Sequence, residues 1–317
     1  MKKFFAGLAV CTAALAMLTF TACGEKNGDK TITLDDGRVY VGQVVDGVPN
    51  GAGTLTDDYG SEWKGNFVDG VLQGYGTYIG YDLVEYEGMF KDGEFEGLGH
   101  RIDAAGNDFK GSFVAGEAEG FGRIEWSSGC YYEGGLHNGV MHGMGWMTWP
   151  GGDAYFGEWT DGNPEGYGCK LFYDASIASS QKGDYSTYNK YVGQMVNNFP
   201  HGQGIMYFQG SGGIYNGKWE QGIRNDENGV YYFESGIEFL KFEGAFSKSK
   251  NNGWIWGHGT MWYADGRVVT GTWEGTECVS VDEETTADNA SVIAEARAVA
   301  RNVTDNELLL TLLREVS

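Results

Sequence analysis

The chain has 317 residues and a formal net charge of −22, because 44 Asp and Glu side chains outnumber 22 Lys and Arg. Nucleic acids and anionic lipid headgroups are bound through basic patches. No dense cluster of lysine and arginine occurs after Lys30. The composition therefore argues against a nucleic-acid-binding protein, and against direct binding of lipid headgroups by the body of the chain.

Residues 1–22 have the pattern of a secretory signal peptide. Lys2 and Lys3 precede an uncharged run that ends at Phe20, and small residues stand directly before Cys23. The ending Phe-Thr-Ala-Cys resembles the signal of bacterial lipoproteins, which implies cleavage before Cys23 and acylation of that residue. The alternative is an uncleaved membrane helix, for which the run barely reaches the required length of about 20 residues.

Cleavage before Cys23 would remove Lys2 and Lys3 and take the net charge from −22 to −24. Lipid chains on Cys23 would then hold the protein at a membrane, and residues 23–30 would form a short polar tether. We expect a location in the bacterial cell envelope, with the outer membrane favoured over the inner membrane.

One sequence phrase recurs every 23 residues from Tyr40 onwards. An aromatic residue followed two positions later by glycine occurs at Tyr40, Trp63, Tyr86, Phe109, Tyr132 and Tyr155. A Gly-x-Gly follows in each copy, from Gly51/Gly53 in the first to Gly166/Gly168 in the sixth. The phrase continues less regularly from Tyr191, Tyr215, Phe242 and Val269. A period this short predicts stacked supersecondary units, and we expect ten of them over residues 31–278, the last one incomplete.

Each unit predicts one β-hairpin. Between the two glycine marks lies a turn signal, such as Asp46-Gly47 or Asn138-Gly139, with Ala115-Gly116 as the weakest copy. Asp-Gly and Asn-Gly supply the positive φ that a tight reversal needs. The residue four positions after each opening residue is apolar, as at Val44, which indicates one buried face. The glycines would leave a trough in which an aromatic ring of a neighbouring hairpin lies flat.

Because a lone hairpin is only marginally stable in water, the units must stabilise one another. With two strands per unit and about 4.8 Å between strands, ten units would extend over roughly 100 Å. The sequence therefore predicts an all-β repeat array, an elongated, twisted, single-layer antiparallel sheet of consecutive hairpins.

These residues resemble the MORN repeat family, whose unit reads Tyr-x-Gly-x-aromatic, then a turn ending in Asp-Gly, then Gly-x-Gly. The resemblance runs from about Tyr40 to Glu274. It implies a hairpin array that acts in protein interaction, scaffolding or dimerisation. Some family members have been proposed to bind anionic phospholipids, which the acidic composition of this chain disfavours.

Two insertions interrupt the array. Residues 173–190 form a polar loop that includes Tyr185 and Tyr188, and residues 247–256 carry Trp254 and Trp256. Long loops on repeat proteins are either functional or tolerated insertions. We consider these four side chains candidate partner contacts.

Residues 279–317 differ from the array. They begin with an acidic link and continue with two short helices, the first with a stripe of Val292, Ala296 and Val299 and the second with leucines that include Leu309 and Leu313. The helices would either cap the last strand edge or bind a partner. Leu309 and Leu313 are therefore further candidate contacts, through which a homo-oligomer could also form.

No chemistry-bearing constellation emerges from the repeats. The recurring Gly-x-Gly lacks the following helix and third glycine of a dinucleotide site, and the three array cysteines and the histidines show no zinc-ligand spacing. We therefore expect no cofactor, no metal and no enzymatic activity. The leading interpretation is a membrane-anchored, non-catalytic protein-interaction scaffold. The alternative is a glycan- or cell-wall-binding module that uses outward Trp146, Trp254, Trp256 and Trp262.

Overall fold

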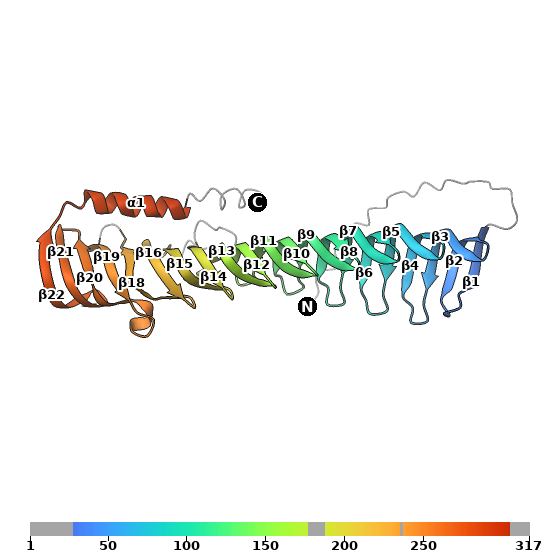
Figure 1. The fold of residues 1–317 in the computed structure, drawn as a ribbon, viewed down its shortest axis with the longest axis horizontal. Coiled ribbons are helices and arrows are strands. Elements are labelled where there is room, and N and C mark those ends of the chain that lie inside the picture. Colours follow the sequence, from blue (N-terminus) through green and yellow to red (C-terminus); the bar gives the residue numbers. More distant parts are fainter. Residues whose placement is uncertain (1–27, 177–187, 235–236, 305–317) are drawn as a thin grey trace, which may run out of the picture.

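The computed structural model describes residues 28–176, 188–234 and 237–304. These residues form one 22-stranded sheet, in which strands adjacent in the chain pair antiparallel. The exception is at β16, which pairs with both the short β17 and β18. Figure 1 shows the hairpins side by side along one axis. The predicted all-β repeat array is confirmed.

The strands in chain order are β1 (Gly28–Thr33), β2 (Val39–Val45), β3 (Val48–Thr56), β4 (Glu62–Val68), β5 (Val71–Ile79), β6 (Glu85–Lys91), β7 (Glu94–Ile102), β8 (Asp108–Val114), β9 (Glu117–Glu125), β10 (Tyr131–His137), β11 (Val140–Thr148), β12 (Ala154–Thr160), β13 (Asn163–Phe172), β14 (Asn189–Val196), β15 (Phe199–Phe208), β16 (Gly213–Glu220), β17 (Ile223–Arg224), β18 (Asp226–Tyr232), β19 (Phe239–Phe246), β20 (Ile255–Tyr263), β21 (Arg267–Glu274) and β22 (Glu277–Thr286). A short 3-10 turn, η2 (Asn251–Gly253), precedes β20, and the helix α1 (Ala290–Thr304) follows β22.

Within the described residues, β2 to β22 make ten hairpins, one for each expected unit. We number the units 1 to 10 from β2–β3 to β21–β22. The turns have the expected chemistry: Asp46 (φ 50°) and Gly47 (φ 86°) both adopt positive φ, which is the type I′ geometry of a two-residue hairpin. Even Ala115 takes this conformation, at φ 48°.

A bulge that the sequence did not suggest interrupts most hairpins. In unit 5, Gly134 pairs with Gly145 and Leu136 pairs with Met141, so three residues of β11 face the single residue Gly135. The first glycine of the Gly-x-Gly, Gly143, lies in this bulge at φ 71°. The carbonyl of Gly135 accepts a hydrogen bond from the Tyr132 hydroxyl at 2.7 Å, and five other tyrosines that open a unit do the same with the residue three positions on.

In most units the opening ring lies over the paired glycines of its own hairpin, as Tyr132 does in unit 5. We expected the ring of a neighbouring hairpin there, and this is found at Gly76 of unit 2, against which Phe90 of unit 3 lies. A Cβ on Gly145 would stand 2.6 Å from Cζ of Tyr132. Contact between units comes instead from the residue four positions after the opening ring. Trp159 of unit 6 donates from Nε1 to the carbonyl of Gly145 at 3.1 Å, and its ring meets Tyr132 edge-on with centroids 5.3 Å apart.

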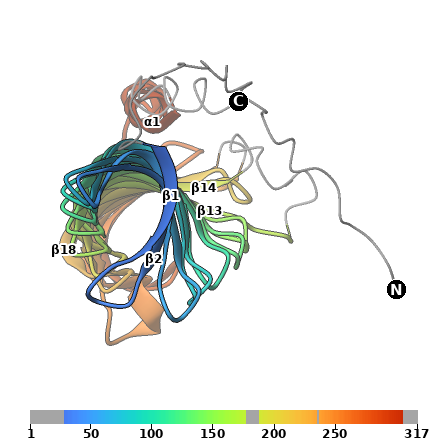
Figure 2. The same ribbon diagram turned by 90° about the vertical axis from the view of Figure 1, so that its right-hand side faces the viewer.

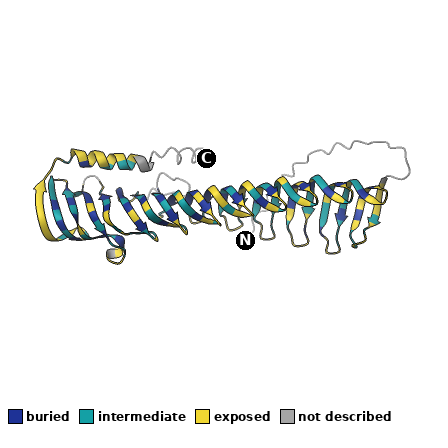
Figure 3. Cartoon of the chain, viewed as in Figure 1, coloured by how far each residue is buried: buried dark blue, intermediate teal, exposed yellow. Residues whose placement is uncertain are grey.

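The sheet has a concave inner face and a convex outer face. Figure 2 shows the strands bent around the long axis, with α1 outside the bend. Tyr232 contacts α1, whereas its neighbour Tyr231 belongs to the main core. Because successive side chains point to opposite faces, the core lies on the inner face. Figure 3 shows the resulting alternation of buried and exposed positions.

Both ends of the array differ from the sequence expectation. Residues 28–30, assigned above to the tether, begin β1, which pairs with β2 through Ile32 and Tyr40. Residues 279–286, assigned to an acidic link, lie in β22, which pairs with β21. Of the two expected helices, the first is α1, with Val292 buried on its stripe. The second lies outside the described residues.

Candidate interaction surface

A row of exposed apolar side chains follows the outer face of units 2 to 6. Its members are the middle residues of five successive Gly-x-Gly segments, each between 48% and 72% exposed: Tyr75, Leu98, Phe121, Met144 and Tyr167. We call these five residues the outer row. One member occurs per unit, so successive members stand about 9.6 Å apart, two strand spacings.

The bulge and its glycines explain why these side chains are open to solvent. Gly97 and Gly99 flank Leu98 and offer it no side chain to pack against. Across the strand pair, Leu98 faces Ser112 and Phe121 faces Gly135, both small. Alternation then directs the middle residue away from the core. The outer row is thus a by-product of the repeat geometry, but its apolar composition is not required by that geometry.

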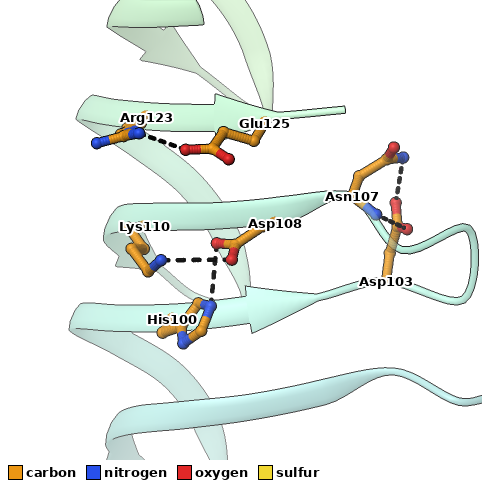
Figure 4. Close-up of polar contacts among 7 residues, drawn as sticks. All are labelled: His100, Asp103, Asn107, Asp108, Lys110, Arg123 and Glu125. Carbon is orange, nitrogen blue, oxygen red and sulfur yellow. Dashed lines mark hydrogen bonds and ion pairs between the residues drawn. The ribbon is translucent and has the colours of Figure 1, made fainter. Parts of the chain in front are cut away.

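Ion pairs flank the outer row on the same face. In Figure 4, His100 and Lys110 both point toward Asp108, with nitrogen–oxygen distances of 3.0 and 3.3 Å. Arg123 pairs with Glu125 on β9, in the same unit as Asp108 and Lys110. Asp103 accepts from Asn107 in the connecting turn at 2.8 Å. An apolar line with a charged border is the composition of many protein–protein interfaces.

Two residues at the ends of the first insertion, Tyr173 and Tyr188, pack on the outer face where the outer row ends. A second apolar cluster forms there from Trp146, Ala154, Cys169, Leu171 and Tyr188. Tyr188 is fully buried and packs 5.4 Å from Tyr173 at the other side of the insertion. Burial raises the pKa of the Cys169 thiol to about 12, so this thiol stays protonated at neutral pH.

Helix α1 covers the outer face further along, where it contacts β14, β15, β16 and β19. Tyr232 donates to Glu295 Oε1 at 2.7 Å, and Lys241 Nζ lies 3.2 Å from Oε2. Burial alone would raise the pKa of Glu295, but these two hydrogen bonds outweigh it and hold the pKa below its usual value. The chain therefore covers the outer face of its later units with its own segments and leaves the outer row exposed.

A family model of the MORN repeat matches the chain eight times, over more than half of its length. The matched residues are 40–58, 63–82, 86–107, 109–131, 132–154, 155–176, 191–212 and 249–266. The chain belongs to the MORN-repeat family. The matches omit units 8 and 10, although both form MORN-like hairpins in the structure.

Comparison with curated proteins gave no match. Among solved structures, the SAS-4 (dCPAP) TCP domain in complex with a proline-rich motif of Ana2 (dSTIL) of Drosophila melanogaster is similar at 12% identity and a TM-score of 0.30, covering 57% of this chain and 83% of that chain. A streptogramin B lyase is similar at 9% identity and a TM-score of 0.16, covering 77% and 90%. These values carry no argument about function.

Three of the candidate contacts predicted from the sequence, Tyr188, Trp254 and Trp256, lie in the described residues, and they do not form an exposed surface. Tyr188 is buried, so it is not a surface contact. Trp254 packs inward, with its ring 4.9 Å from Tyr231 and the Arg224 guanidinium 4.5 Å from its centroid. Trp256 is partly buried, with Lys250 5.9 Å from its ring. Tyr185, Leu309, Leu313 and the lipidation candidate Cys23 lie outside the described residues.

The outer row was missed, although a signal for it was present. Five consecutive MORN units carry an apolar residue between two glycines, where no packing partner exists on either side in the sequence.

In the part of the chain that the structure describes, no three His, Cys, Asp or Glu side chains converge on a metal site. Across the same residues, no helix has the length and apolar character needed to cross a bilayer.

Proposed function

We propose that this MORN-repeat protein is a membrane-anchored lipoprotein of the bacterial cell envelope that holds a protein partner along its outer row. The observation that carries the proposal is the contrast along the outer face. Trp146 and Leu171 are buried in the cluster that includes Tyr188, and Val292 of α1 is buried where the helix packs on the sheet. Leu98 and Phe121, in contrast, are exposed. Aligned exposed apolar side chains mark interaction sites.

A protein fits this surface better than the other ligands considered. The net charge of −22 opposes nucleic acid and anionic lipid. Glycan binding needs an open aromatic platform, yet Trp146 is 4% exposed and Trp254 packs against the core. Lys241 Nζ lies 4.9 Å from the centroid of Trp262, which occupies one face of that ring. Lipids and sugars therefore have less support than a protein with a complementary apolar line.

The anchor is proposed from the sequence of residues 1–23. Only four residues separate Cys23 from β1, and a chain extends at most about 3.5 Å per residue. Lipid on Cys23 would therefore hold the β1 end of the array within about 18 Å of the membrane. Unit 2, where the outer row starts, follows β1 by three strands, so the partner would bind the membrane-proximal half.

Cell fractionation combined with cross-linking tests both parts of the proposal. Wild-type protein should sediment with membranes at mature size and cross-link to a protein partner. A Cys23→Ala variant should yield no mature-size membrane species. The double variant Leu98→Glu/Phe121→Glu should stay anchored and lose the partner, because two charges interrupt the apolar line. Val114→Glu is the matched control, since Val114 is 53% exposed in the same unit as Phe121 but outside the outer row.

Two results would contradict the proposal. A mature-size Cys23→Ala protein that remains wholly with membranes would remove the lipid anchor. Equal cross-linking by wild type, Leu98→Glu/Phe121→Glu and Val114→Glu would remove the outer row as the binding surface.

A further inference from the structure

The outer row lies where a bound segment finds no backbone to pair with. β7 pairs with both β6 and β8, and β9 pairs with both β8 and β10. Extended peptides that bind sheets add to an exposed edge and gain main-chain hydrogen bonds there. A segment laid across the outer row must instead satisfy its own backbone groups, which a helix does. The position of the row thus favours a helix over a strand.

Helix α1 shows that this face accepts a helix laid along the array. Its 15 residues span about 22 Å. It contacts β14, β15, β16 and β19, and the four strand steps from β14 to β19 cover about 19 Å. The helix axis therefore crosses the strands and follows the long axis, as Figure 1 shows.

The spacing of MORN units matches the spacing of one helix face. Every seventh residue of an α-helix returns to nearly the same face after about 10.5 Å, close to the roughly 9.6 Å between outer-row residues. In α1, Val292 and Val299 are seven residues apart and are both shielded, while the residues on the opposite side are exposed. One apolar residue per heptad can therefore meet one outer-row residue per unit.

We propose that the outer row receives an amphipathic α-helix of the partner, laid lengthwise along the array with an apolar side chain every seven residues. This inference rests on the proposed function and specifies the partner element. The intramolecular α1 interface and the outer row are parts of one continuous outer face. The first is occupied by the chain itself, and the second is complementary to a helix supplied in trans.

Site-specific photo-cross-linking in the full-length anchored protein tests the helix. A benzophenone amino acid replaces Leu98, Phe121 or Met144, one at a time, and Val114 in the control. All four side chains are exposed, so the fold should be kept, and circular dichroism of each variant checks this. Mass spectrometry then identifies the residue cross-linked at each position.

The intervals between cross-linked residues distinguish the outcomes. A helix predicts that neighbouring outer-row positions map about seven residues apart in one partner segment. An extended segment would give intervals of about three residues and would overturn the helix while leaving the proposed function intact. Cross-links only to this chain, in a second copy or in its residues 305–317, would overturn the partner helix. Yields no higher than those at Val114 would overturn the helix together with the proposed function.

Discussion

The two glycines of each Gly-x-Gly serve different physical purposes. Gly143 lies at φ 71°, and no atom beyond its chain neighbours comes within 4 Å of the point where a Cβ would stand, so only its backbone conformation requires glycine. Gly145 has no positive φ, but Tyr132 covers it so closely that a Cβ would stand 2.6 Å from Cζ. The first glycine permits the bulge, and the second makes room for the ring.

Alanine at these two positions should therefore destabilise the protein by different amounts. We expect Gly145→Ala to cost about 3 kcal/mol, because Tyr132 must leave its position. Gly143→Ala should cost about 1 kcal/mol, the usual penalty of left-handed backbone for a residue with a Cβ. Urea unfolding followed by tyrosine and tryptophan fluorescence measures both. Equal losses, or a larger loss for Gly143→Ala, would contradict this division of roles.

At the level of single residues, the sequence predicted the turns and the need for glycine beneath an aromatic ring. The turn conformation is set by the two residues of each pair, as in Asp46-Gly47 and Asn138-Gly139, so a short segment of sequence is enough to predict it. The sequence did not predict that the ring of the same hairpin lies over most of these glycines, whereas the expected ring of the next hairpin is found at Gly76. That outcome depends on the bulge at Gly143, which repositions one strand against its partner, and bulges are set by pairing across strands, not by local preference.

Helix α1 packs on the sheet through both polar and apolar side chains. Glu295 accepts from Tyr232 and Lys241, and Val292 is buried on the helix face that packs on the sheet. The lowered pKa of Glu295 means that the carboxylate is stabilised when docked. A group of this kind contributes its stability in full above its unfolded pKa, near 4.3, and loses it as the pH falls through the folded pKa.

Docking of α1 should accordingly be constant from about pH 7 to pH 5 and weaken below about pH 4. The effect should be modest, because the Glu295 side chain is 48% exposed. Hydrogen exchange of amides in residues 290–301, corrected for the intrinsic rate at each pH, measures it, with β6 as the internal reference. Glu295→Gln should remove the pH dependence. If acid still weakens the docking of α1 to the same extent in Glu295→Gln, the pH dependence comes from another titratable group.

The stripe of α1 could be predicted from the sequence, because Val292, Ala296 and Val299 recur at helical spacing. The surface on which α1 docks could not be predicted, since the complementary residues Tyr232 and Lys241 are far away in the chain.

The strand β22 was missed for another reason. Its residues are almost all exposed, many of them acidic, which is unlike a core strand but suits the last strand of an open sheet, where charge discourages further pairing.

The whole molecule is a series of similar units, in which the same glycine pairing recurs at each junction. Gly99 of unit 3 faces Gly111 of unit 4, and Gly122 of unit 4 faces Gly134 of unit 5. Rings also join adjacent units, as Trp159 of unit 6 does with Tyr132 of unit 5. In such arrays stability is approximately a sum of unit and nearest-neighbour contributions. The elongated shape and its regularity were therefore predictable from the 23-residue period alone.

Removal of one whole unit should leave a folded, shorter array. Deleting residues 109–131 brings Gly99 opposite Gly134. Gly134 has the same position in unit 5 that Gly111, the native partner of Gly99, has in unit 4. We expect cooperative unfolding to persist and small-angle scattering to show a molecule shorter by about 9.6 Å. Deleting Thr77 alone removes far less chain but should be more destructive, because Tyr78 would move from the inner to the outer face of β5. If the 23-residue deletion unfolds the protein while the deletion of Thr77 is tolerated, the units are not interchangeable, and the array must depend on contacts beyond nearest neighbours.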